Sequence, residues 1–152
     1  MSHVSKVLTA AQQKCAESGV RLTTKRQNIL QVMVTAGQPL SPYEVVDRYS
    51  DMFQEKMPAN SAYRILDFLV SENLAHKLAS AQKYVVCSHI SCDHAHETPQ
   101  FLICSNCQSV KEIGVQTSLI KKLKSDVEAT GYKMTSQQLE IECLCPKCQS
   151  KD

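Results

Sequence analysis

The first half of the chain has the spacing of apolar residues that is typical of a helical domain. Apolar positions recur every three or four residues up to Gly19 and again up to Gly37, which predicts two helices that end near these glycines. In the stretch PLSPYEVVDRYS, Ser41, Pro42 and Glu44 match the cap, the first position and the third position of a capping box. We therefore expect a third helix that begins at Pro42.

A fourth helix and a hairpin follow. The segment NSAYRILDFLVSEN after Pro58 has Asn60 as its expected N-cap and leaves Tyr63, Arg64 and Asp67 on its polar side. Its apolar stripe consists of Ile65, Leu66, Leu69 and Val70. The segments LAHKL and KYVVC have the pattern of two short strands joined by ASAQ. Helices followed by such a hairpin predict a winged-helix domain, whose last helix enters the major groove of DNA.

The second half of the chain combines strands with one helix. The stretches FLIC and QSVKEI predict two strands, and apolar periodicity predicts a helix from Thr117 to Thr130 that Gly131 ends. The last strand, QLEIEC, alternates polar residues with an expected buried face of Leu139, Ile141 and Cys143. The whole pattern predicts an α+β protein, with a helical domain first and a mixed α/β domain second.

Four of the eight cysteines form two C-x-x-C pairs. Cys104 and Cys107 lie in FLICSNCQS, and Cys145 and Cys148 lie beyond a gap of 37 residues in ECLCPKC. The spacing lets both sulfur atoms of a pair face one metal ion, so the four residues predict a structural zinc site. Cys143, on the buried face of its strand, is expected to be a small core residue.

The composition is that of a globular protein with reduced cysteines. The chain has 152 residues, of which 43% are hydrophobic. We find neither a secretion signal nor an apolar stretch of about 20 residues. A cytoplasmic protein is therefore expected, in which cysteines bind metal rather than form disulfides. The net charge of +2 does not by itself indicate nucleic-acid binding, although basic residues exceed acidic ones in the first half only.

The fourth predicted helix offers side chains for DNA recognition. Tyr63 and Arg64 lie near its N-terminus, where side chains reach base edges, and an arginine can bind guanine through two hydrogen bonds. Ser61 precedes them and belongs to the same expected interface. The expected phosphate contacts are Lys25, Arg26 and Lys56. Taken alone, this region also fits an ordinary helical domain in which Tyr63 and Arg64 merely cover the surface.

A polar connector, CSHISCDHAHETPQ at residues 87–100, carries three of the five histidines and two cysteines. In an extended segment, Cys92, His94 and His96 would point to one side. The connector therefore predicts both a linker and a source of metal ligands. A third metal ion near His89, Cys92 and His94 is left open.

Two classes of cysteine-containing enzyme do not fit the chain. A zinc deaminase requires H-x-E and P-C-x-x-C, whereas here the proline lies inside CPKC and His94 is followed by Ala95 and His96. A thiol oxidoreductase uses one C-x-x-C at a strand-to-helix turn, whereas this chain has two pairs at expected strand ends. We therefore expect no enzymatic activity.

Five motifs follow one another along nearly the whole chain. They are RLTTKRQNIL, SAYRILDFL, HK before a wing strand that ends at Cys87, CSNCQSVKE and CPKC. This order resembles the ferric uptake regulator family, specifically its zinc uptake regulator branch. The resemblance implies a winged-helix DNA-binding domain at residues 1–86, a hinge at 87–100 and an α/β dimerisation domain at 101–152. It also implies a homodimeric repressor that binds operator DNA when zinc-loaded and represses zinc-uptake genes.

The same resemblance implies two zinc ions per subunit, one structural and one regulatory. The regulatory ligands correspond to His76 in the wing, Cys87 at its end, a linker histidine and Glu112 in QSVKEI. His96 matches the linker position best, and His94 is the alternative. Thiolate, imidazole and carboxylate ligands suit tetrahedral Zn²⁺, whereas iron or manganese sites rely more on nitrogen and oxygen. An iron-, manganese- or peroxide-sensing regulator of the same family is the alternative function.

Overall fold

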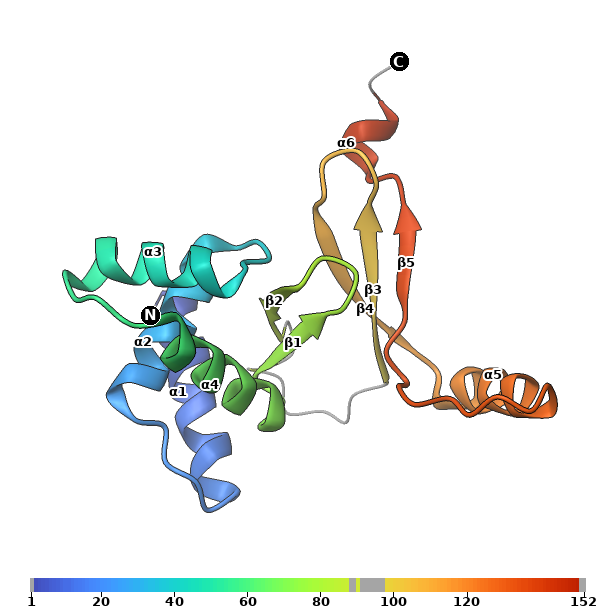
Figure 1. The fold of residues 1–152 in the computed structure, drawn as a ribbon, viewed down its shortest axis with the longest axis horizontal. Coiled ribbons are helices and arrows are strands. Elements are labelled where there is room, and N and C mark those ends of the chain that lie inside the picture. The colour runs from blue at the N-terminus through green and yellow to red at the C-terminus, as the bar shows by residue number, and fades with distance from the viewer. Residues whose placement is uncertain (1, 88–89, 91–97, 151–152) are drawn as a thin grey trace. The chain divides into compact units, whose positions relative to one another are not determined.

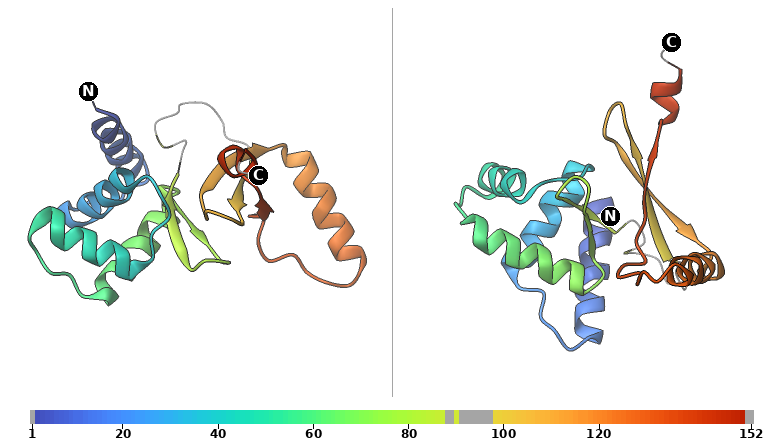
Figure 2. Two further views of the ribbon diagram at one scale, coloured as in Figure 1. Left: turned by 90° about the horizontal axis from the view of Figure 1, so that it is seen from above. Right: turned by 45° about the vertical axis from the view of Figure 1, so that its right-hand side comes forward.

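The computed structural model describes residues 2–87, 90 and 98–150. The chain divides into two compact units, Met1–Cys92 and Asp93–Asp152. Figure 1 and Figure 2 show the helices and hairpin of the first unit and the sheet of the second. Among the described residues, no helix has both the length and the apolar character needed to cross a membrane.

The first unit consists of four helices and a hairpin. In chain order its elements are α1 (His3–Glu17), α2 (Thr24–Ala36), α3 (Pro42–Phe53), α4 (Ala59–Ser71), β1 (Ala75–Leu78) and β2 (Lys83–Val86). The two strands pair antiparallel, with His76 opposite Val85 and Lys77 opposite Tyr84. Residues from all the helices and from the hairpin form one core, which includes Ala11, Ile29, Leu30, Val45, Tyr49, Leu66, Leu69 and Tyr84. The predicted helices and hairpin of this half are confirmed.

The local sequence accounts for the best-defined helix ends. Oγ of Ser41 accepts a hydrogen bond from the backbone N–H of Glu44 at 3.2 Å, and the Glu44 carboxylate accepts one from the backbone N–H of Ser41 at 3.1 Å. This is the predicted capping box of α3. The hydrogen bond from the Ser41 N–H lowers the pKa of Glu44. Helix α2 ends at Gly37, whose φ of +64° is a conformation that glycine adopts without steric cost.

Two predicted helix ends are wrong by one or two residues. Helix α4 begins at Ala59 with Pro58 as its N-cap, so Asn60 lies inside the first turn instead of capping it. The carbonyl of Pro58 already accepts from the backbone N–H groups of Ser61 and Ala62, at 3.0 and 3.2 Å, which starts the helix earlier. Helix α1 ends with Ser18 as its C-cap rather than with the glycine that follows.

The second unit is a three-stranded sheet with two helices. In chain order its elements are β3 (Thr98–Cys104), β4 (Val110–Val115), α5 (Thr117–Ala129), β5 (Glu140–Cys143) and α6 (Pro146–Gln149). The strand order is β4-β3-β5, with β3 antiparallel to β4 and parallel to β5. Because Cys104 is opposite Cys143, the parallel strands β3 and β5 finish level with each other, at the same end of the sheet (Figure 1). The segments that carry the two C-x-x-C pairs therefore begin side by side.

The face of β5 that the sequence predicts to be buried is only partly covered in the single chain. Ile141 is 42% exposed and Cys143 is half-buried. Strand β5 stands at one edge of the sheet, where only one neighbouring strand shields it. The expectation of a buried Ile141 is therefore wrong for one chain by itself.

Candidate metal centres and nucleic-acid interface

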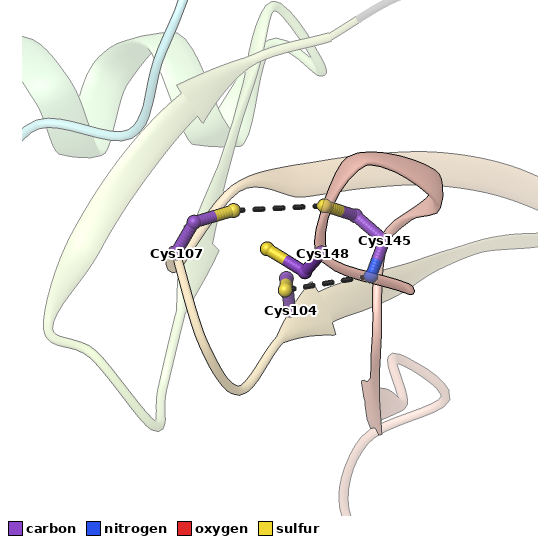
Figure 3. Close-up of side chains that lie close together, drawn as sticks. All are labelled: Cys104, Cys107, Cys145 and Cys148. Carbon is purple, nitrogen blue, oxygen red and sulfur yellow. Dashed lines mark hydrogen bonds between the residues drawn. The ribbon is translucent and has the colours of Figure 1, made fainter. Parts of the chain in front are cut away.

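Four cysteine side chains converge where β3 and β5 end. Cys104 is the last residue of β3, Cys107 lies in the turn towards β4, and Cys145 and Cys148 lie at the start and within the single turn of α6. Their four Sγ atoms all lie within 4.8 Å of one another, and Figure 3 shows the four side chains gathered in one place. The structure thus brings together the four residues that the C-x-x-C spacing predicts as partners. Cys143 does not belong to this group.

The separation of the sulfur atoms fits a tetrahedral metal ion better than a disulfide. Four Zn–S bonds of about 2.3 Å place sulfur ligands about 3.8 Å apart, and the Sγ atoms of Cys107 and Cys145 are 3.7 Å apart. A disulfide needs about 2.05 Å between its sulfur atoms, and the four cysteines are free thiols. A set of four soft sulfur donors is typical of structural zinc.

Hydrogen bonds at this cluster favour the thiolate form that binds metal. Donation from the backbone N–H groups of Cys107 and Cys145 lowers the pKa of Cys104 to about 6. The side-chain amide of Asn106 donates to Sγ of Cys148 at 3.2 Å. This donation lowers the pKa of Cys148, but the neighbouring Cys145 thiol and burial raise it overall to about 11. Four thiolates this close therefore need a cation among them at neutral pH.

Two further side chains of the kind that ligate metal lie on the hairpin of the first unit. His76 lies in β1, and Cys87 directly follows β2. The backbone N–H of Cys87 donates to the carbonyl of Leu74 at 3.0 Å, which continues the antiparallel pairing past the end of β2. A ring nitrogen of His76 and Sγ of Cys87 consequently lie within 4.8 Å of each other. An imidazole and a thiolate at this separation can bind one ion.

The other predicted regulatory ligands lie elsewhere in the sequence. Glu112 lies in β4 of the second unit and is half-buried. The two alternative connector histidines, His94 and His96, lie outside the described residues. His89 and Cys92, which belong to the possible third metal site, also lie outside the described residues.

The predicted DNA-reading residues lie on the outer side of α4. Tyr63 is 39% exposed and Arg64 is exposed, whereas Leu66 and Leu69 on the inner side are fully buried. Ser61, in the first turn, is half-buried. The apolar stripe of α4 therefore directs Tyr63 and Arg64 towards solvent.

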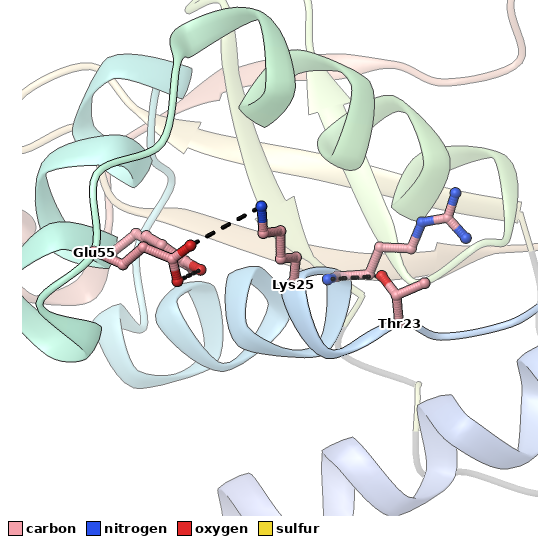
Figure 4. Close-up of polar contacts among 5 residues, drawn as sticks. Thr23, Lys25 and Glu55 are labelled. Atoms are coloured by element: carbon pink, nitrogen blue, oxygen red, sulfur yellow. Dashed lines mark hydrogen bonds and ion pairs between the residues drawn. The ribbon is translucent and has the colours of Figure 1, made fainter.

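Lys25 lies at the start of α2 beside an acidic residue. Its Nζ is 3.9 Å from Oε1 of Glu55, and the two side chains are 65% and 52% exposed (Figure 4). Glu55 also accepts a hydrogen bond from the hydroxyl of Tyr49 at 3.0 Å. An exposed ion pair of this kind contributes about 1 kcal/mol or less, so a phosphate group can compete with Glu55 for Lys25. Lys56, the third predicted basic contact, is exposed.

Arg26 has internal partners that the sequence did not reveal. Its guanidinium carbon lies 3.8 Å from the centre of the Phe68 ring in α4, and its Nη1 donates to the carbonyl of Arg21 at 2.7 Å. Oγ1 of Thr23 accepts from the Arg26 backbone N–H at 3.4 Å and caps α2 (Figure 4). Arg26 thus connects α2 to α4.

Known proteins resemble this chain over most of its length. The model of the ferric uptake regulator family matches residues 17–142. The chain is 30% identical over 145 residues to the zinc uptake regulation protein of Escherichia coli (strain K12), which covers 93% of this chain and 81% of that protein. It is also 30% identical over 145 residues to the ferric uptake regulation protein of Synechococcus elongatus, with 88% of each chain covered. A solved zinc uptake regulator in complex with zinc and DNA superimposes with a TM-score of 0.83 at 26% identity, covering 98% of this chain and 97% of that one.

Proposed function

This chain belongs to the ferric uptake regulator family, and from that premise we propose that it is a zinc-responsive, dimeric repressor of zinc-uptake genes. Sequence identity does not indicate which metal the protein senses, because the chain is 30% identical both to a zinc uptake regulation protein and to a ferric uptake regulation protein. The observation that carries the choice is the pair of His76 and Cys87 on the hairpin, with ligand atoms within 4.8 Å. A thiolate ligand favours zinc over ferrous iron or manganese.

In this proposal, the four-cysteine cluster holds a structural zinc ion. Support comes from the 3.7 Å between Sγ of Cys107 and Sγ of Cys145, and from the hydrogen bonds that Sγ of Cys104 and Sγ of Cys148 accept. When bound, the ion supplies coordinate bonds between the end of β3 and α6. Because Cys104, Cys107, Cys145 and Cys148 all belong to the second unit, the free energy of binding stabilises the fold of that unit. We expect this site to stay filled in the folded protein.

His76, Cys87, Glu112 and a connector histidine form the regulatory site in this proposal. His96 is the first choice for the connector ligand and His94 the alternative. His76 and Cys87 belong to the first unit and Glu112 to the second, so ligation by all four residues would restrict the angle between the units. To change the DNA-competent fraction from 1:99 to 99:1, that form must bind zinc about 10⁴-fold more tightly than the other.

The proposed DNA interface is centred on α4. Tyr63 and Arg64, with Ser61, face the bases, and the basic residues Lys25, Arg26 and Lys56 contact phosphates. The exposure of Tyr63 and Arg64 supports this arrangement, as does the likeness to a regulator solved with zinc and DNA. Arginine at such a position can read guanine in the major groove.

A second copy of the chain is the proposed partner of the second unit. Leu119, Ile141 and Leu144 are 59%, 42% and 46% exposed in the single chain. Exposed apolar side chains that form one contiguous patch are typical of an interaction surface, and Ile141 and Leu144 lie three residues apart at the end of β5. Burial of Ile141 against a second copy would also complete the apolar alternation of β5.

Metal content and DNA binding measured on the same preparation test this function. Protein purified without added metal should contain about one zinc ion per subunit and gain a second one on titration with zinc. Binding to duplexes that the zinc-loaded protein selects from a random-sequence library should then appear with zinc. It should disappear with a mild chelator that leaves the first ion in place. Stronger binding with iron or manganese than with zinc would favour the alternative sensor.

A further inference from the structure

A buried tyrosine joins the hairpin to the outer side of α4. Tyr84 lies in β2 and is 1% exposed, and its hydroxyl donates a hydrogen bond to Oδ1 of Asp67 at 3.0 Å. Asp67 is exposed on α4, four residues after Tyr63 and three after Arg64, and this spacing places all three on one side of the helix. The bond therefore connects the hairpin to the side of α4 that is proposed to read DNA.

Tyr84 is itself fixed in position. Its backbone N–H donates to the carbonyl of Leu40 at 2.8 Å, and its carbonyl accepts from the Leu40 N–H at 3.0 Å. Burial and the hydrogen bond to Asp67 raise the pKa of Tyr84 to about 12, so the hydroxyl keeps its proton at neutral pH. The Asp67 carboxylate is thus held by a buried donor and not by a mobile surface side chain.

The two faces of the hairpin have different partners. Directly opposite residues of paired strands share a face, and successive residues point to opposite faces. Tyr84 is opposite Lys77, whose Nζ lies 5.8 Å from the centre of the Tyr84 ring. His76 is opposite Val85 on the other face, with its ring near the Cys87 thiol. One pair of strands therefore carries the contact to α4 on one face and the proposed regulatory ligands on the other.

We propose that Tyr84 is a positioning residue, which holds α4 through Asp67 at the angle that sequence-selective DNA binding requires. This inference rests on the proposed function, because it takes α4 as the DNA-reading helix. Tyr84 is buried and cannot contact a base itself. Without its hydroxyl, α4 can shift against the hairpin while Lys25 and Lys56 still contact phosphates. Selectivity among sequences then falls, and general DNA affinity does not.

The test compares Tyr84→Phe with the wild-type protein. This substitution removes the hydroxyl and keeps the ring in the core. The probes are a duplex that the zinc-loaded wild-type protein selects from a random-sequence library and the unselected library DNA. We expect the variant to bind the selected duplex about tenfold more weakly, the effect of one hydrogen bond to a charged group, with unchanged binding to the unselected DNA.

Substitutions of Asp67 separate the hydrogen bond from other effects. Asp67→Ala should lose selectivity as Tyr84→Phe does, and the double variant should lose no more than either single one, because both remove the same interaction. Asp67→Asn keeps an oxygen that accepts from the Tyr84 hydroxyl, so it should recover most of the selectivity. A role that is merely structural for the core would not produce this recovery.

Tyr49→Phe is the matched control. Tyr49 is also fully buried, and its hydroxyl donates to a carboxylate, Glu55, at 3.0 Å. Neither residue lies in α4 or in the hairpin. Tyr49→Phe should lower thermal stability about as much as Tyr84→Phe, and should leave the ratio of binding to selected and unselected DNA as in the wild type.

Three outcomes would overturn the inference: equal losses on both DNAs for Tyr84→Phe, additive losses in the double variant, or Asp67→Asn as weak as Asp67→Ala. A different failure would appear in the wild type alone. If zinc-loaded wild-type protein selected no duplex from the library, the proposed function would be wrong and the inference would be wrong with it.

Discussion

The surroundings of each cysteine determine whether it packs in the sheet or belongs to the metal cluster. Cys143 and Cys145 are separated by one residue, yet Cys143 belongs to β5 opposite Cys104, whereas the Sγ of Cys145 lies in the four-sulfur cluster. Spacing and strand alternation were enough to predict this division from the sequence. The hydrogen bond from Asn106 to Sγ of Cys148 was not predictable, because it depends on the turn geometry of both C-x-x-C segments together.

Replacement of a clustered cysteine should remove the structural zinc. Cys104→Ser or Cys148→Ser should lose about one zinc ion per subunit and unfold or dissociate the second unit, because three sulfur ligands bind zinc far less tightly than four. Cys143→Ser is the matched control and should keep the metal. Zinc quantified after gel filtration measures both. A Cys143→Ser protein without the structural zinc would show that the cluster has been assigned wrongly.

Arg64 and Lys25 should differ in what their loss does to DNA binding. Arg64→Ala should cost about 1 to 3 kcal/mol on selected DNA and relax the choice of base, because a base-edge contact is lost. Lys25→Ala should weaken binding to all sequences and reduce its salt dependence. Glu55→Gln should have the opposite sign on all sequences, because it removes the carboxylate 3.9 Å from Lys25 Nζ. Equal losses on selected and random DNA for Arg64→Ala would exclude α4 as the reading helix.

Most elements can be predicted from apolar periodicity, whereas helix ends are best predicted where a particular residue, such as Ser41 or Gly37, favours them. Ser41 was recognisable because its hydroxyl and the Glu44 carboxylate form a capping box at fixed spacing. Pro58 was not, because its carbonyl, which every residue has, begins the hydrogen bonds of α4. The exposure of Ile141 depends on which surface covers β5, and the alternation of apolar and polar residues in the strand does not identify that surface.

Removal of the two predicted caps should have unequal effects on stability. Ser41→Ala should cost about 1 kcal/mol, since it removes a capping hydrogen bond from α3, and lower the melting temperature by about 4 to 8 °C. Asn60→Ala, inside the first turn of α4, should change the melting temperature little. Calorimetry at neutral pH measures both. A larger loss of melting temperature for Asn60→Ala than for Ser41→Ala would indicate that Asn60 does cap α4.

Glu44→Gln should change how stability depends on pH, because it removes the carboxylate that accepts from the backbone N–H of Ser41. The capped Glu44 has a lowered pKa in the folded protein, so its contribution is fully present above the ordinary carboxyl pKa and is lost as the pH falls through the lowered value. The difference in melting temperature between wild type and Glu44→Gln should therefore shrink in acid. A difference that grew below the ordinary carboxyl pKa would contradict the role of the carboxylate in the capping box.

At the scale of the whole molecule, the two metal sites should respond to different changes. The four-cysteine cluster lies wholly in the second unit, so its occupancy is linked to the folding of that unit. The proposed regulatory ligands come from both units and the connector, so we expect the occupancy of that site to be linked to DNA binding. The sequence could predict the choice between His94 and His96 only by resemblance, because alternation in an extended connector places both on the same side.

Cys87→Ser separates the two roles and is the most direct test of the mechanism. Serine is close to cysteine in size, so the variant should remain a folded dimer with about one zinc ion per subunit. It should nevertheless lose zinc-dependent binding to selected DNA, because the thiolate that completes the pair with His76 is gone. His96→Ala should behave in the same way, and His94→Ala should lose little. The reverse ranking would identify His94 as the connector ligand, and the mechanism would still hold. The mechanism would be wrong if Cys87→Ser still bound selected DNA only when zinc was supplied, because ligation between the units would then not control DNA binding.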